Sequence, residues 1–230
     1  MAYRERASAV PDVVLWQRDA RPQPAAARVL PDGCMDLIWD GARLFVAGPD
    51  TRARLHAPGP DVSYVGLRFS RGAGPGLLGV AAHEVRDQTP DLSDLWPSAA
   101  ARALSEQVAV APQQVLERWL VGRAADHGPP LLGAAVFDLA AQGTQVGVIA
   151  HRLGYSVRQL HRRCLPLFGY GPQHLARVLR LGRAVAAACT GMSLARVSAR
   201  TGFADQAHLS REVRDLAGTT PGNLLRELSG

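Results

Sequence analysis

Between residues 129 and 230 the apolar residues recur at the three- and four-residue spacing of amphipathic helices. The helix over 172–188 is the longest, at about 25 Å. Pro166 falls inside an earlier helix, and we expect that helix to kink or stop there. Six of these helices have a recognisable first residue or N-cap, namely Pro129, Thr144, Ser156, Pro172, Ser193 and Asp205, and a short terminal helix follows Pro221.

In the first half of the chain the apolar pattern has a period of two residues. Residues 34–39 and 42–47, on either side of Asp40-Gly41, predict a β-hairpin, and residues 62–69 predict a further strand. Turns rich in Gly and Pro separate the strands, at 48–50, 57–61 and 72–76.

The helical period returns over residues 97–125, with a break near Pro112. Short strands with Gly- and Pro-rich turns predict a small β-barrel or sandwich, which these helices follow. The second half predicts helices alone. We therefore expect an α+β chain of two domains, over residues 1–125 and 129–230, joined by a linker at 126–128.

The second half contains one pattern twice, about 48 residues apart. Each copy has a short apolar helix, a Gly-aromatic turn and a second helix rich in Arg, Gln and His. A repeat of this kind is typical of two helix-turn-helix units, in which the second helix enters the DNA major groove. With one extra residue in the second copy, the matched pairs are Leu160 and Leu209, Arg162 and Arg211, Gly169 and Gly218, and Pro172 and Pro221.

The distribution of charge favours the same function. The chain has no lysine, and its net charge of +6 comes from arginine. Residues 129–230 carry 12 Arg against 5 acidic residues (12 − 5 = +7), and residues 1–128 carry 14 Arg against 15 (14 − 15 = −1). A cationic half joined to a neutral half is expected of a protein that binds a polyanion with one domain.

Composition disfavours several other classes of protein. No stretch approaches the ~20 apolar residues of a membrane helix, and the first residues lack the apolar run of a signal peptide. Cys34, Cys164 and Cys189 are scattered, which favours reduced thiols in a cytoplasm over a disulfide framework or a four-ligand zinc site. His56 and His83 are isolated, so we expect no metal and no cofactor.

Together these motifs resemble the AraC/XylS family of transcription regulators, over about residues 130–228. Residues 154–162 and 202–221 match the family's two reading motifs, and residues 177–184 match its linker. Cys164 and Val213 depart from it, because the family usually has a core aromatic there. The resemblance implies a sequence-specific transcription regulator that is not an enzyme. Its implied partners are double-stranded DNA and RNA polymerase, and we expect an activator, with repression left open.

The resemblance also implies which side chains contact bases. Arg can bond guanine bidentately and Gln can bond adenine, while Ser suits phosphate contacts. Ser156 and Ser210 are therefore assigned to phosphates. Base contacts are assigned to Arg158, His161 and Arg162 in the first unit, and to Gln206, His208 and Arg211 in the second.

Residues 31–39, with later motifs at 78–80 and 92–96, resemble the N-terminal domain of a subset of the same family. The resemblance implies a cupin-like β-barrel that acts as a sensor or a dimerisation module. Asp36, Trp39 and Arg68 are candidates for an effector pocket, and a structural ion pair of Asp36 with Arg68 is the alternative. Cys34 as a redox or alkylation sensor would need an electropositive setting.

The apolar residues Leu116, Trp119 and Leu120 allow two interpretations, a homodimer interface or packing on their own barrel. Three other functions remain as alternatives. An alkylation-repair methyltransferase would need a four-cysteine zinc site, and a metal cupin enzyme would need a histidine cluster. A regulator controlled by a protein partner is not distinguished from an effector-responsive one.

Overall fold

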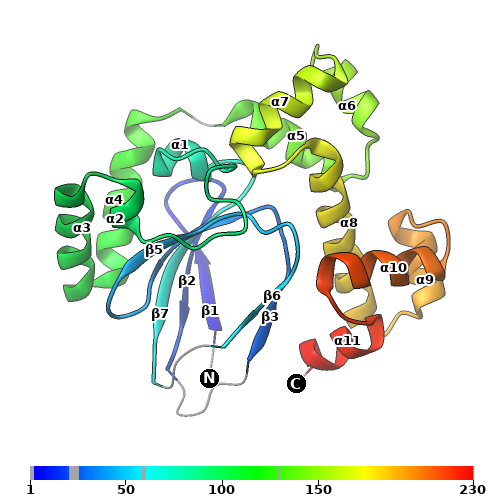
Figure 1. Cartoon of the computed structure of the whole chain (residues 1–230), viewed down its shortest axis with the longest axis horizontal. Coiled ribbons are helices and arrows are strands. Elements are labelled where there is room, and N and C mark those ends of the chain that lie inside the picture. Colours follow the sequence, from blue (N-terminus) through cyan, green and yellow to red (C-terminus); the bar gives the residue numbers. More distant parts are fainter. Residues whose placement is uncertain (1–2, 21–25, 58–60, 129, 230) are drawn as a thin grey trace.

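The computed structural model describes residues 3–20, 26–57, 61–128 and 130–229. An antiparallel sheet domain comes first, and a helical half lies beside it (Figure 1). The strands are β1 (Tyr3–Ala7), β2 (Val13–Arg18), β3 (Ala27–Val29), β4 (Met35–Trp39), β5 (Leu44–Ala47), β6 (Arg54–His56) and β7 (Tyr64–Phe69). The helices that complete the first half are α1 (Gly74–Leu78), α2 (Leu92–Leu95), α3 (Ser98–Val110) and α4 (Pro112–Asp126).

Five strands form one antiparallel sheet in the order β1-β2-β7-β4-β5, while β3 and β6 pair separately as a two-stranded ribbon. The expected α+β class is confirmed, but the described strands form these two sheets and not one closed hydrogen-bonded ring. The predicted hairpin is confirmed as β4 and β5. Trp39 pairs with Leu44, so the loop has four residues and not the two expected, and Asp40 Oδ1 accepts from the backbone of Ala42 and Arg43.

Helices α3 and α4 cover one face of the sheet (Figure 1). Leu116 and Leu120 are fully buried there, and Trp119 packs against Trp96 with ring centroids 5.8 Å apart. These side chains serve the core of their own domain. Leu116 and Leu120 are therefore not available to a twofold interface, because they are buried in their own domain, while Trp119 is half-buried.

The second half is helical throughout its described residues, and α8 is its spine (Figure 1). The first half of α8 joins one core with Leu175 and Val178, and the second half joins another with Leu181 and Ala184. The helices are α5 (Leu131–Ala141), α6 (Val146–Arg152), α7 (Val157–Phe168), α8 (Pro172–Cys189), α9 (Leu194–Thr201), α10 (Gln206–Ala217) and α11 (Pro221–Ser229).

Two of the expected turn or helix signals lie outside the described residues, namely Pro58-Gly59-Pro60 and Pro129. A third is wrong: Gln145, and not Thr144, precedes α6 as its N-cap residue, without a side-chain hydrogen bond. The backbone N–H of Thr144 instead bonds Leu139, which closes the preceding helix. In the described ranges, no helix combines the length and apolar character needed to cross a membrane.

Candidate nucleic-acid interface

Helix α7 begins with a reciprocal cap. Ser156 Oγ accepts a hydrogen bond from the Gln159 N–H at 3.2 Å, and Gln159 Oε1 accepts one from the Ser156 N–H at 2.8 Å. This capping box satisfies two donors that a helix start leaves unpaired. The helix ends at Gly169, whose φ of 78° is the left-handed conformation that glycine adopts without strain.

Pro166 does not stop α7, which continues to Phe168. The expectation of a stop was wrong because the proline lies in the last turn. Its missing N–H costs only the bond to the carbonyl four residues earlier. The carbonyl of Pro166 in turn accepts a hydrogen bond from the Ala82 N–H at 2.9 Å.

One face of α7 packs in the core and the opposite face is exposed. Leu160 and Cys164 are fully buried, as expected, and Arg158, His161 and Arg162 are exposed. Arg158 and Arg162 form no hydrogen bond, ion pair or ring contact within the described chain. The guanidinium groups of both side chains are therefore available to an external acceptor. The ring of His161 lies against Gly171, so close that a Cβ there would meet Nδ1 at 2.3 Å.

Helix α10 repeats this arrangement. Asp205 caps it by accepting a hydrogen bond from the His208 N–H at 2.6 Å. Gln206 and Arg211 are exposed and, in the described chain, have no internal partner, while Ser210 is half-buried. The His208 side chain points back toward the preceding turn, where its Nδ1 accepts a long hydrogen bond from the Ala204 N–H at 3.4 Å and its ring packs edge-on with Phe203.

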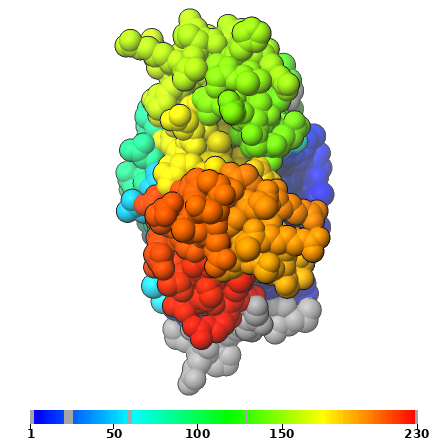
Figure 2. Space-filling model, turned by 90° about the vertical axis from the view of Figure 1, so that its right-hand side faces the viewer, coloured from blue at the N-terminus to red at the C-terminus, as the bar shows by residue number. Residues whose placement is uncertain are grey.

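The two units lie one above the other on the same side of the molecule, with α6 and α7 above α9 and α10 (Figure 2). The first helices of the two units also carry exposed arginines, which were not among the predicted DNA contacts. Arg152 ends α6, and Arg200 lies in the last turn of α9. Both are exposed and 48 residues apart, so the repeat itself contained the signal that pairs them.

Not every arginine of the second half faces outward. Glu212 of α10 is 7% exposed, and its carboxylate accepts hydrogen bonds from Arg177 at 2.9 Å and from Arg180 at 3.3 Å. Arg177 also pairs with Asp215. Burial raises the pKa of Glu212, but the two guanidinium groups outweigh it and hold that pKa below its ordinary value. The network holds α10 against α8 and leaves these two arginines paired within the fold.

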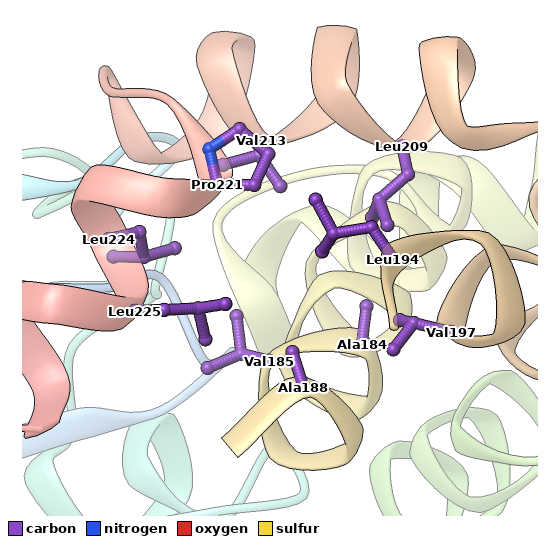
Figure 3. Close-up of a pocket in the computed structure, with 10 residues that line it drawn as sticks. All are labelled: Ala184, Val185, Ala188, Leu194, Val197, Leu209, Val213, Pro221, Leu224 and Leu225. Atoms are coloured by element: carbon purple, nitrogen blue, oxygen red, sulfur yellow. The ribbon is translucent and has the colours of Figure 1, made fainter. Parts of the chain in front are cut away.

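An apolar cavity of about 20 Å³ lies in the second unit, between α8 and the three helices that follow it (Figure 3). Its walls are aliphatic, and a water molecule there would lack the polar partners it needs. The side chains that line it are Ala184, Val185, Ala188, Leu194, Val197, Leu209, Val213, Pro221, Leu224 and Leu225. Val213, which stands where the resembled family has an aromatic, is among them.

Val213→Ile should stabilise the protein by about 0.8 kcal/mol, because the added methyl group enters space that is apolar and empty. Val213→Ala should destabilise it by about 2 kcal/mol, since it enlarges the same cavity. Urea-induced unfolding of both variants and the wild type measures the differences. An Ile variant less stable than the wild type would show that the cavity cannot accept a methyl group from this position.

A second cavity, of about 410 Å³, lies in the first half between the five-stranded sheet and the β3–β6 ribbon. Asp36 and Arg68 both line this cavity, and they also form an ion pair, with 3.4 Å between Asp36 Oδ1 and Arg68 Nε. The pocket and the ion pair, which were alternatives in the sequence, therefore occur together. Asp36 Oδ1 also accepts a hydrogen bond from Trp16 Nε1 at 2.7 Å. Burial raises the pKa of Asp36 to about 6, against the lowering effect of Arg68.

Trp39 does not line this cavity. It is buried in the core on the opposite face of β4, because side chains alternate along a strand and Trp39 lies three positions from Asp36. Trp16 of β2 lines the cavity in the role that was expected of Trp39.

Cys34 borders the same cavity in an acidic setting. Burial, followed by Asp32 and Asp36, raises the pKa of its thiol well above the ordinary value. This setting is the reverse of the electropositive one that a reactive thiolate needs. Cys164 is buried in the core of the first unit and Cys189 is exposed at the end of α8, so the three cysteines do not meet. The described residues hold no group of three or more potential metal ligands.

Comparison with known proteins agrees with this architecture. Residues 149–227 match a family described as a helix-turn-helix domain, and residues 13–91 match a domain of unknown function, DUF6597. No curated protein matches the chain.

Among solved structures, an apo variant of ToxT from Vibrio cholerae has a TM-score of 0.50 at 12% identity, covering 96% of this chain and 100% of that one. A second structure of ToxT from the same organism has a TM-score of 0.50 at 10% identity and covers 94% and 98%. At these identities the likeness concerns the fold alone. The chain thus joins an N-terminal domain that matches a family of unknown function to a C-terminal helix-turn-helix domain.

Proposed function

We propose that this protein is a sequence-specific DNA-binding transcription regulator of the AraC/XylS type. One observation carries the proposal. Two helices with satisfied N-terminal caps each present an arginine without an internal partner, Arg162 on α7 and Arg211 on α10, at matched positions of the repeat. Arginine on the exposed face of a recognition helix suits bidentate bonds to guanine in the major groove.

Other side chains of the same face fit the supporting contacts. Arg158 and Gln206 are assigned to bases, together with His161 and with His208 through its Nε2. Helices α7 and α10 are the two proposed reading helices. The hydroxyl groups of Ser156, at the start of α7, and of Ser210, within α10, suit contacts with phosphates. Arg152 and Arg200 are added as phosphate contacts, since the first helix of a helix-turn-helix unit crosses the DNA backbone.

The test is a selection of binding sites from random duplex DNA with the full chain, followed by affinity measurements. Arg162→Ala and Arg211→Ala should each weaken binding to the selected site by about 5- to 150-fold. Each variant should relax base preference in a different tract, and the two tracts should be centred about 10 base pairs apart.

Arg118→Ala is the matched control, because Arg118 is also exposed but lies on α4 of the first half. It should leave both affinity and base preference unchanged. The proposal fails if the wild type selects no sequence, or if both recognition-helix variants keep the wild-type preference.

We further propose that the 410 Å³ cavity binds a small-molecule effector, with Asp36 and Arg68 among its contacts. The support is its size and its mixture of charged and apolar walls, which resembles ligand sites in general. The proposed partners are double-stranded DNA and RNA polymerase, with activation as the outcome, in the cytoplasm. A homodimer stays a prediction, for sedimentation of the full chain to check, and no surface is assigned to it.

A further inference from the structure

The last turn of each reading helix is held by the first half of the chain. At the end of α7, the carbonyl of Pro166 accepts a hydrogen bond from the Ala82 N–H at 2.9 Å. The carbonyl of Gly169 accepts one from the Arg86 guanidinium at 3.1 Å. Carbonyls at a helix end lack intrahelical partners, and a cation there complements the helix dipole.

The end of α10 has the same pair of contacts. The carbonyl of Leu216 accepts a hydrogen bond from the Ala53 N–H at 2.7 Å, and that of Ala217 accepts one from Arg28 at 2.8 Å. Both carbonyls lie within one residue of the positions that the repeat matches to Pro166 and Gly169. One backbone N–H and one arginine from the first half therefore hold each reading helix at corresponding places.

Two of the segments that supply these contacts, residues 49–53 and 82–87, are hydrogen-bonded to each other. Asp87, next to Arg86, accepts hydrogen bonds through Oδ1 from the N–H of Thr51 at 2.6 Å and from its hydroxyl at 2.9 Å. The Asp87 N–H bonds the carbonyl of Pro49 at 3.2 Å. The Thr51 carbonyl in turn lies 3.1 Å from Nε2 of His174 on α8. Hydrogen bonds, together with the backbone of residues 49–53 and 82–87, thus connect α7 to α10.

Close packing restricts movement at the first contact. A Cβ at Gly169 would lie 2.6 Å from Cγ of Pro49 and 3.2 Å from the carbonyl oxygen of Ala82. Since the helix end touches both segments, α7 cannot shift along its axis without moving them.

We propose that the contact between Asp87 and Thr51 is a positioning device that couples the two reading helices, so that the first half of the chain sets the spacing of the DNA tracts they read. The inference rests on the proposed function. Helix α8 joins the two units, and the coupled segments of the first half form a second connection between them. Asp87 and Thr51 are positioning residues, since both belong to the first half of the chain and lie outside the helices assigned to DNA.

The decisive variant is Asp87→Gly. Asp87 has a φ of 59°, which glycine adopts readily, so this change removes the acceptor and keeps the backbone. Asp61→Gly is the matched control, because Asp61 has a φ of 57° and is exposed, and within the described residues it makes no hydrogen bond or ion pair between the halves. Asp87→Asn should restore the wild-type behaviour in part, because its amide oxygen can accept from Thr51.

The measurement uses full-length protein and the duplex that the wild type selects from random DNA, with zero, one or two base pairs inserted between the tracts. One inserted base pair rotates the second tract by about 34°. The wild type and Asp61→Gly should prefer the original spacing over one insertion by about 30-fold, and Asp87→Gly by about 5-fold or less. Arg28→Ala combined with Arg86→Ala should lose the same preference.

The outcomes separate the two proposals. If the wild type selects no sequence, the proposed function fails. If it selects a site but Asp87→Gly keeps the 30-fold preference, or weakens binding equally at every spacing, the coupling is overturned. Thermal unfolding of each variant shows whether it is folded, and the double arginine variant decides the matter if Asp87→Gly is not.

Discussion

Raising the salt concentration from about 50 to about 200 mM should weaken binding of the full chain to its selected duplex by about a thousandfold. Contacts with about six phosphates release their condensed counterions, which gives a log–log slope of about −5. Exposed arginines of the two helix-turn-helix units supply this charge, among them Arg152, Arg162, Arg200 and Arg211. Fluorescence anisotropy of a labelled duplex across a salt series measures the slope.

Single variants measure how much each side chain contributes to that slope. Arg152→Ala and Arg200→Ala should each reduce its magnitude by about one, and weaken binding to any DNA sequence by a similar factor. Arg102→Ala, on the exposed face of α3, should leave the slope as it is. A wild-type slope near zero, or a slope that Arg102→Ala changes as much as the others do, would contradict the assigned face.

Glu212→Ala should lower the free energy of unfolding by about 3 kcal/mol and the melting temperature by roughly 6–12 °C. The change leaves Arg177 and Arg180 beside an apolar core without their shared acceptor. The value is at the lower end for a buried ion pair, because both arginines are partly exposed. Asp19→Ala is the control: its pair with Arg4 is solvated, so about 0.5 kcal/mol is expected.

The same carboxylate predicts a dependence on pH. The pKa of Glu212 is lower in the folded protein than its ordinary value of 4.5. Its contribution is therefore complete above pH 4.5 and is lost as the pH falls through the folded pKa. The stability difference between wild type and Glu212→Gln should shrink over that acid range. A difference that stays constant down to pH 3 would show that charge is not what the pair contributes.

The helical half could be predicted in detail because its signals are local. Ser156 and Asp205 lie directly before the helices they cap, and Gly154 and Gly202 begin the predicted Gly-aromatic turns with a left-handed backbone conformation. The correspondence of Arg162 with Arg211 could be predicted from the repeat alone. These features depend on neighbours within a few residues, which a sequence displays directly.

The sheet half could be predicted less well because its pairing is distant in sequence. Strand β1 is exposed along its whole length and shows no alternation, and β3 pairs with β6 across an intervening hairpin. Trp39 was assigned to the wrong face because nothing local shows which side of β4 the helices cover. The Arg177–Glu212 pair was missed because a sum of charges does not show which of them meet inside the fold.

The length of α8 has a consequence for how this protein can change in evolution. Because Leu175 and Val178 face one core and Leu181 and Ala184 the other, a residue inserted between them would leave both cores with their own sets of side chains. It would also turn one unit against the other by about 100°. On the proposed function, the pitch of the DNA double helix decides whether this segment can accept an insertion or a deletion. The segment should therefore keep its length even where its surface residues change.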